Sequence, residues 1–153
     1  MDGENSLRMS QGIKLTSEEM RYIALFDSVT GAIAVDCIID DKRDRIIMVI
    51  KPGDTGLAIG KHGARIKMFR NMVKRDVEIV EAANDAVGLI KNSFAPARIK
   101  EVRITERLDN KKVAVVTVDS RDRGVAIGRE GRTAERTRLL AKRYYQIDNV
   151  IVG

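Results

Sequence analysis

One motif occurs twice in this 153-residue chain: GLAIGKHG at residues 56–63 and GVAIGREG at residues 124–131. The two copies lie 68 residues apart, and Asp54 and Asp122 each stand two residues ahead of the motif. Counting the aspartates, six identities fall within ten aligned positions. Self-similarity at a fixed spacing has to be recognised before any other pattern is interpreted. The motif therefore indicates an internal duplication.

The duplication extends on both sides of the motif. Residues 45–50 match residues 113–118 at the same offset, and both stretches are rich in β-branched residues. Further upstream the two copies match at an offset of 65, so three residues are gained in the turn between two predicted strands. We divide the chain into copies at 14–81 and 82–153, preceded by a tail at 1–13 that we expect to be flexible.

Each copy predicts the same order of elements: helix, strand, strand, helix, helix, strand. In the first copy, Thr16 and Glu19 have the spacing of a capping box, and Gly31 ends the first helix. Its other elements are expected at 32–39, 45–51, 54–59, 64–75 and 77–80. Those of the second copy are expected at 85–94, 98–106, 112–118, 121–127, 132–145 and 149–152. The predicted fold class is α/β (α+β), with two domains that each pack a three-stranded sheet on helices.

The composition is that of a globular protein with a basic surplus. Apolar residues make up 44% of the chain and charged residues 33%, and the net charge of +6 lies entirely in residues 82–153. A basic surplus favours a polyanionic partner. A single cysteine excludes an internal disulfide framework, and the apolar runs are too short to span a membrane. Residues 1–10 do not resemble a signal peptide. We expect a cytoplasmic protein without membrane attachment.

The glycine loops have the properties of an anion site. Glycine permits positive φ and lets another backbone approach closely. Each loop also precedes a predicted helix, whose free N–H groups attract anions. Among the central residues, Lys61, His62 and Arg129 can contact a phosphate, whereas Glu130 cannot.

A simple turn between two helices is the alternative interpretation, because Gly-x-x-Gly is a common pattern. The recurrence of the loop in the same setting argues against it. So does the basic character of the following helices, which have six basic residues each against no acidic residue in the first copy and two in the second. These basic residues are Lys61, Arg65, Lys67, Arg70, Lys74 and Arg75, and Arg129, Arg132, Arg136, Arg138, Lys142 and Arg143.

The segments IGKHG (59–63) and IGREG (127–131) resemble the signature loop of the KH domain. The predicted order of elements resembles the type II version of that domain. Two directly abutted copies over residues 14–153 resemble the NusA-like family of transcription termination and antitermination factors. The resemblance implies two tandem type II KH domains that bind single-stranded RNA and act in transcription termination, antitermination or pausing. RNA polymerase is a further candidate partner.

The resemblance also implies the residues that hold RNA. In KH domains a glycine loop clamps the backbone of about four nucleotides beside an apolar cleft. The implied RNA-binding residues are Gly60, Lys61, His62, Gly63, Arg65 and Lys67 in the first copy, and Gly128, Arg129, Glu130, Gly131 and Arg132 in the second. Four apolar residues would lie near the two clefts: Ile59, Ile66, Ile127 and Ala134. For the isoleucines we favour packing in the core.

An enzyme is disfavoured by the same residues. The segment 56–62 superficially resembles a phosphate-binding P-loop, but it has three residues between its glycines instead of four. His62 also stands where Ser or Thr would bind magnesium. With one histidine and one cysteine, an ordinary zinc site is not available. Cys37 is expected in the core, and Asp40 and Asp41 in a solvated turn. We therefore predict no catalytic residue, no metal, no cofactor and no small-molecule substrate.

Two other functions stay open: an RNA-binding or ribosome-associated KH protein outside transcription, and a scaffold for protein interactions. A scaffold would need a large exposed apolar surface. The candidates for one have helical spacing, which is more typical of core residues; they are Met68, Phe69, Met72, Tyr144 and Tyr145.

Overall fold

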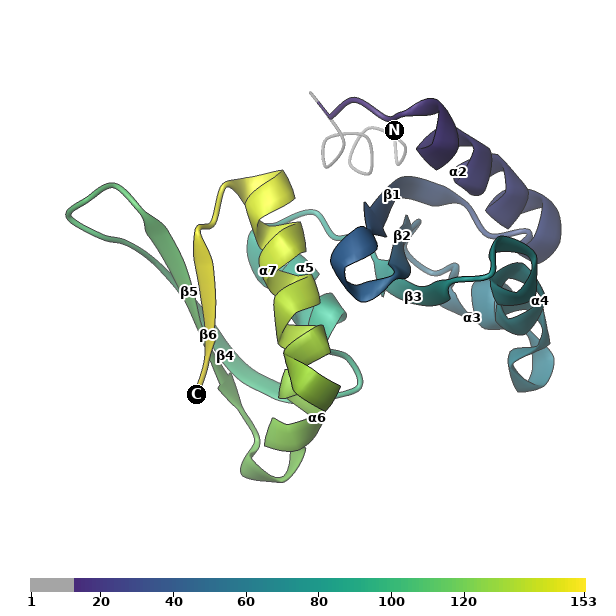
Figure 1. Cartoon of the computed structure of the whole chain (residues 1–153). Helices are drawn as coiled ribbons and strands as arrows, with labels where there is room; N and C mark the ends of the chain where they lie inside the picture. The colour runs from purple at the N-terminus through teal and green to yellow at the C-terminus, as the bar shows by residue number, and fades with distance from the viewer. Residues whose placement is uncertain (1–12) are drawn as a thin grey trace. The chain divides into compact units, whose positions relative to one another are not determined.

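A computed structural model describes residues 13–153, and the chain divides into two compact units between Ala82 and Ala83 (Figure 1). The tail expected at 1–13 lies, except for residue 13, outside the described residues. Both units have the order helix, strand, strand, helix, helix, strand. Each contains one three-stranded sheet. The predicted fold class is confirmed.

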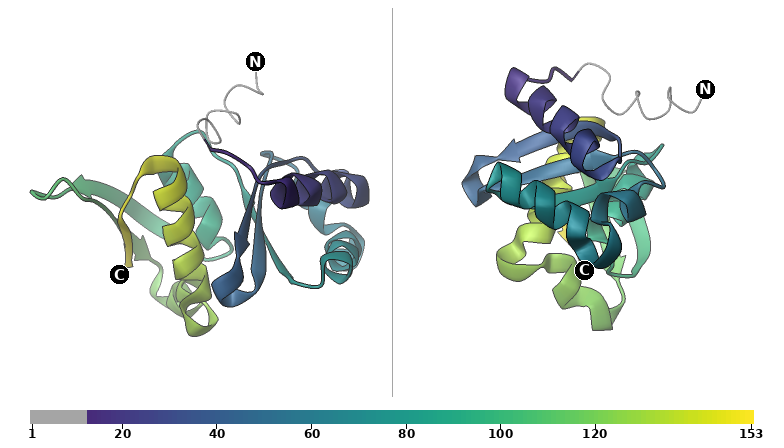
Figure 2. Two further views of the ribbon diagram at one scale, coloured as in Figure 1. Left: turned by 45° about the horizontal axis from the view of Figure 1, so that its top comes forward. Right: turned by 90° about the vertical axis from the view of Figure 1, so that its right-hand side faces the viewer.

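The first unit has a mixed sheet with the strand order β1-β2-β3. Strand β2 pairs antiparallel with β1 and parallel with β3. Helices α2 and α4 pack on one face of this sheet (Figures 1 and 2). The elements are α2 (Ser17–Thr30), β1 (Ala34–Asp40), β2 (Arg45–Ile50), α3 (Thr55–Ile59), α4 (Ala64–Val73) and β3 (Asp76–Glu81).

Helix α2 begins and ends where its sequence predicts. The Thr16 hydroxyl accepts the Glu19 N–H at 3.1 Å, and the Thr16 N–H donates to the Glu19 carboxylate at 2.7 Å. This capping box satisfies two N–H groups that the first turn would otherwise leave open. At the other end, Gly31 adopts a φ of 76° and donates its N–H to the Asp27 carbonyl. That left-handed cap is favourable for glycine and stops the helix.

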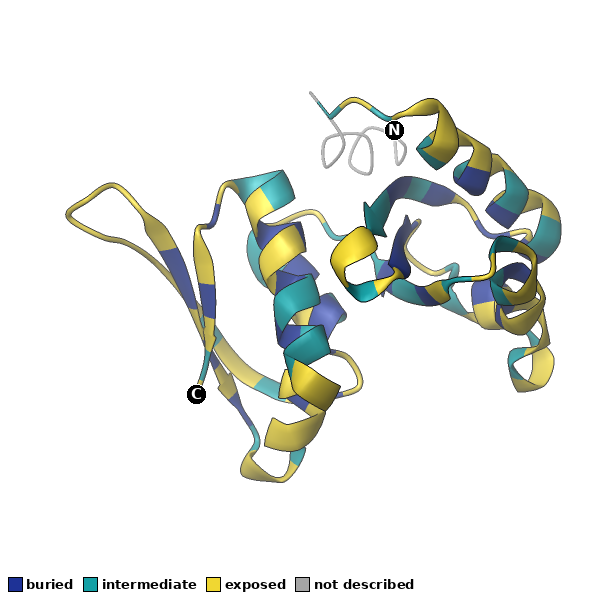
Figure 3. Ribbon diagram, in the orientation of Figure 1, coloured by how far each residue is buried: buried dark blue, intermediate teal, exposed yellow. Residues whose placement is uncertain are grey.

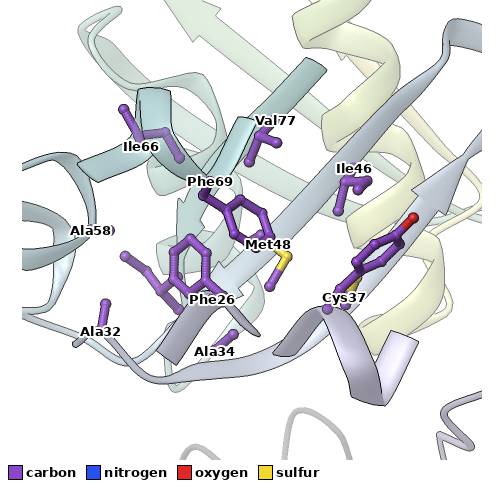
Figure 4. Close-up of a cluster of buried hydrophobic side chains, with 12 residues drawn as sticks. Phe26, Ala32, Ala34, Cys37, Ile46, Met48, Ala58, Ile66, Phe69 and Val77 are labelled. Carbon is purple, nitrogen blue, oxygen red and sulfur yellow. The ribbon is translucent and has the colours of Figure 1, made fainter. Parts of the chain in front are cut away.

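The core of the first unit forms around two aromatic rings (Figure 4). Phe26 of α2 and Phe69 of α4 meet edge to face with ring centroids 5.0 Å apart. Met48 belongs to the same cluster, and so does Cys37, whose predicted core position is confirmed. The helical spacing of Phe69 was correctly interpreted as core packing. For its neighbours Met68 and Met72 that interpretation is wrong, because they are 57% and 51% exposed.

A buried arginine crosses the sheet of the first unit. The guanidinium of Arg45, with no exposed surface, lies 2.8 Å from the Asp40 carboxylate and 3.1 Å from that of Glu78. The predicted solvated turn is therefore wrong for Asp40, whose side chain is 10% exposed, and right for Asp41 at 84%. Breaking a buried pair leaves an uncompensated charge, so these contacts favour one register of the three strands.

The second unit repeats this architecture. Strand β5 pairs antiparallel with β4 and parallel with β6, and α5 and α7 pack against each other and the sheet. The elements are α5 (Ala86–Phe94), β4 (Ile99–Glu106), β5 (Lys112–Val118), α6 (Arg123–Ile127), α7 (Arg132–Tyr145) and β6 (Asn149–Val152). Strands β5 and β6 and helix α7 have the predicted bounds. Helix α4 ends two residues earlier than predicted because Lys74 adopts a left-handed φ of 58°.

The core of the second unit contains a buried pair of hydroxyl groups. The hydroxyls of Ser93 and Thr137 are buried and lie 2.7 Å apart, where the first unit has Phe69 in the position of Thr137. Figure 3 shows buried positions alternating along β5 with exposed ones. Tyr144 and Tyr145 are half-buried at the end of α7. Within residues 13–153, no helix is long and apolar enough to cross a membrane.

Candidate nucleic-acid interface

The two glycine loops have the same backbone conformation. Each connects a five-residue helix to a longer one: α3 to α4 in the first unit, and α6 to α7 in the second. Three of the four residues in each loop have positive φ. The φ values are 73°, 56° and 75° for Gly60, His62 and Gly63, and 80°, 56° and 75° for Gly128, Glu130 and Gly131. The duplicated sequence therefore specifies one loop geometry twice.

The first glycine of each loop is required by both conformation and space. Gly60 and Gly128 have ψ values of 177° and 167°, which at these φ values fall in a region that only glycine readily adopts. A Cβ on Gly60 would lie 2.7 Å from Cγ of Arg65, and one on Gly128 would lie 2.8 Å from the backbone nitrogen of Thr133. The absence of a side chain lets the following helix start directly against the loop.

The last glycine of each loop is required by conformation alone. Gly63 and Gly131 adopt the ordinary left-handed conformation. A Cβ on Gly131 would have no neighbour within 4 Å. Each of these glycines donates its N–H to the carbonyl of the first glycine of its loop at 3.1 Å. That hydrogen bond closes the loop around its two central residues.

The central side chains of both loops point into solvent at a helix N-terminus. Lys61, His62, Arg129 and Glu130 are all exposed. Neither α4 nor α7 has a side-chain N-cap, so no capping side chain satisfies the N–H groups of the first turn. The first N–H of each helix is used within the loop, since Ala64 donates to the Lys61 carbonyl and Arg132 to the Arg129 carbonyl. The positive end of the helix dipole favours an anion at this position. The geometry suits a phosphate in both units.

Exposed apolar side chains stand beside each loop. Ile59 and Ile127 are 41% and 39% exposed, so the predicted core packing is wrong for both; it is confirmed for Ile66. Leu57 and Val125, at matching positions of α3 and α6, are 45% and 50% exposed. Sequence reasoning missed these two residues. The residue between the two exposed positions of each short helix is a fully buried alanine, Ala58 or Ala126.

The basic residues near the loops have different surroundings. Arg65 donates to the Thr30 carbonyl at 3.3 Å and to the Leu57 carbonyl at 3.2 Å, so it ties α2 to α3. Lys67 is exposed on α4, and Arg132 is partly buried in the first turn of α7. Arg65 therefore has a structural role within its unit, whereas Lys67 presents its charge to solvent.

The repeated aspartates hold each loop region against its sheet. Asp54 accepts the N–H of Ile33 at 2.9 Å, and Asp122 accepts the N–H of Arg98 at 2.8 Å. Ile33 and Arg98 lie just before the first strand of their sheets. The aspartates thus join the start of that strand to the residue before the short helix. The alignment of the two copies identifies these aspartates as a repeated feature, but the sequence alone does not predict their hydrogen-bond partners.

The contribution of the contact between Asp122 and Arg98 to stability should depend on pH. Hydrogen bonds from the Arg98 side chain, and then from its backbone N–H, lower the pKa of Asp122 from 3.8 to about 2. A lowered pKa stabilises the fold above the unfolded-state value, and this stabilisation is lost as pH falls from about 4 towards 2. The stability difference between wild type and Asp122→Asn should therefore shrink over that range. Urea titrations followed by NMR signals of the second unit measure it, and a constant difference would contradict the assignment.

Comparison with known proteins agrees with this geometry. Residues 20–91 match the KH domain family, and residues 86–143 match the family of NusA-like second KH domains. The fold and the paired glycine loops thus define a tandem KH-domain protein. A "Probable transcription termination protein NusA" of Halococcus morrhuae is 40% identical over 138 residues, which cover 90% of this chain and 96% of that protein. The chain belongs to the NusA family of KH-domain proteins.

Two further relatives extend the comparison. A protein of Methanococcus vannielii with the same name is 34% identical over 92% of this chain and 79% of its own length. The crystal structure of APE1850 superposes with a TM-score of 0.82 at 34% identity, covering 91% of this chain and 100% of that one.

Proposed function

We propose that this protein binds single-stranded RNA through its two glycine loops and acts in transcription termination, antitermination or pausing. The observation that carries the proposal is the recurrence of one loop geometry at two uncapped helix N-termini, each beside exposed apolar side chains. The names of its relatives support the role in transcription. Association with RNA polymerase and a cytoplasmic location are the finer parts of the proposal.

In the proposed mode, each loop holds the sugar–phosphate backbone and the apolar side chains contact the bases. The candidate clamp residues are Gly60, Lys61, His62 and Gly63, with Lys67, and Gly128, Arg129, Glu130 and Gly131, with Arg132. Arg65 would act mainly by positioning the loop, since its guanidinium donates to Thr30 and Leu57. Leu57 and Ile59 would contact bases in the first unit, and Val125 and Ile127 in the second. Apolar contact and backbone groups tolerate several sequences, so affinity should depend more on strand accessibility than on one base.

Filter binding with a single-stranded oligouridylate at two salt concentrations tests the proposal. Binding should weaken as salt rises, because log K falls by about 0.7 per log unit of salt for each phosphate contact on a single strand. A double-stranded RNA of equal length is the control and should bind more weakly, since paired bases cannot reach the apolar side chains. Absence of binding at low salt would favour a protein-interaction scaffold instead.

A transcription assay separates the role in termination from general RNA binding. Purified RNA polymerase transcribes a template with a terminator, and the fraction of transcripts that pass the terminator should change when wild-type protein is added. A loop variant with Lys61→Asp and His62→Asp should lose that effect. An unchanged transcript pattern with wild-type protein would instead favour an RNA-binding role outside transcription.

A further inference from the structure

A basic hollow lies at the end of α4 opposite to the glycine loop. It has a volume of about 500 Å³ and is formed by the turn before β2, the last turn of α4 and the turn before β3. Its lining contains four cationic side chains and two carboxylates, so its net charge is positive. The charged residues are Arg43, Arg70, Lys74 and Arg75, with Asp44 and Asp76.

A polar stripe on α4 connects the glycine loop to this hollow. Lys67, Arg70 and Asn71 stand at positions i, i+3 and i+4, which share one side of a helix, and Lys74 follows at the C-cap of α4. The stripe starts at the loop, since a Cβ on Gly63 would lie 3.8 Å from Cε of Lys67. Helix α4 contains no acidic residue. The ten residues of α4 span about 15 Å at 1.5 Å per residue.

Ion pairs orient the arginines of the hollow. Arg75 lies 3.3 Å from Asp41 and 3.8 Å from Asp44, and the Arg70 Nε lies 3.8 Å from Asp76. Lys74 differs from them: it is exposed, and among residues 13–153 it makes no ion pair. Its left-handed backbone conformation fixes where its side chain leaves the helix. Lys74 is therefore the cation best able to accept an external anion.

Stabilisation of the helix dipole is the simpler explanation for cations at this position. Basic side chains at a helix C-terminus interact favourably with its carbonyls. This accounts for Arg70 on α4 and for Lys74 at its C-cap, but not for Arg43, which comes from the turn before β2. Basic side chains gathered from separate elements on one face are the electrostatic pattern expected of a surface that binds a polyanion.

We propose that this hollow binds a backbone phosphate of the same single-stranded RNA that the loop at 60–63 clamps. The RNA would run along the stripe on α4, so the binding track of the first unit would extend beyond the four nucleotides of one KH clamp. This inference rests on the proposed function. It predicts that an RNA long enough to reach the hollow binds more tightly than one that reaches only the glycine loop, and that this gain depends on the cations of the hollow.

The test compares RNAs of two lengths on wild type and Lys74→Asn. Asparagine tolerates the left-handed conformation at this position, so the variant removes the charge without straining the chain. For a 12-nucleotide oligouridylate, affinity at 0.1 M salt should fall about fivefold and the salt slope by about 0.7, as expected for one lost phosphate contact. For a 4-nucleotide oligouridylate, the affinity should be unchanged. Lys91→Gln, which removes one exposed charge from α5, is the matched control and should behave as wild type.

Two results would overturn the inference: wild-type affinity of Lys74→Asn for the 12-nucleotide RNA, or an equal loss for both lengths. An equal loss would mean that the variant disturbs the clamp itself. Failure of the proposed function gives a separate result, because wild-type protein would then bind neither the 12-nucleotide nor the 4-nucleotide RNA. NMR spectra provide a second measurement: backbone amides at 70–75 should shift on addition of the 12-nucleotide RNA and not of the 4-nucleotide RNA.

Discussion

Replacement of Lys61 and His62 together by aspartate is expected to weaken binding of short single-stranded RNA by about 2–4 kcal/mol. Two groups able to contact phosphates are exchanged for two negative charges beside them. Charge-assisted contacts are worth roughly 1.5–3 kcal/mol each when lost, before repulsion is counted. The fold should be retained, because both side chains are exposed and aspartate tolerates the left-handed φ of 56° at position 62. Titration with RNA measures the effect, and circular dichroism controls for folding.

The matched variant in the second unit should lose less affinity. Arg129→Asp with Glu130→Asp removes only one positive charge, since Glu130 is already acidic. The first loop should therefore be the tighter clamp, although the second copy has the larger net charge. Native structure together with wild-type affinity in both variants would show that the glycine loops do not hold RNA.

Gly128→Ala is expected to cost about 3 kcal/mol of stability in the second unit. The alanine would have to occupy a backbone region costing about 1–3 kcal/mol, and its Cβ would lie 2.5 Å from Oγ1 and 2.8 Å from the nitrogen of Thr133. For a unit of this size, such a loss lowers the melting temperature by about 12–24 °C. Thermal unfolding monitored by circular dichroism measures the shift.

Other glycine variants make this prediction specific. Gly131→Ala keeps an ordinary left-handed conformation with open space around it, so it should cost about 1 kcal/mol. Gly60→Ala should fall between the two, because the nearest atom is Cγ of Arg65, a side chain that can move. If Gly128→Ala and Gly131→Ala melted at the same temperature, the close approach of Thr133 would not be what requires glycine at position 128.

The order of elements could be predicted because the duplicated sequence gives two independent patterns for the same fold. A doubtful segment in one copy was supported by its partner, and α7 (Arg132–Tyr145) has the predicted bounds. The capping box of Thr16 and Glu19 likewise depends only on residues three apart. Local patterns of this kind are visible in a sequence without knowledge of the tertiary structure.

Exposure beside the loops could not be predicted in the same way. A five-residue helix such as α3 has too few positions for its periodicity to define a buried face, so Ile59 was assigned to the core. The buried Arg45 posed a different difficulty, because its partner Glu78 is 33 residues away in the sequence. Such pairings depend on strand register, which the hydrophobic pattern alone did not reveal.

The positive φ angles of the glycine loops have a consequence for the kinetics of RNA binding. Three of the four residues in each loop have positive φ, which His62 and Glu130 would rarely adopt in a flexible chain, and hydrogen bonds from Gly63 to Gly60 and from Gly131 to Gly128 close the loops. The entropy of ordering these loops is therefore lost when the protein folds, and not when RNA arrives. Association should need no slow rearrangement of the loops. Differences in affinity among RNAs should therefore appear mainly in the dissociation rates of the complexes.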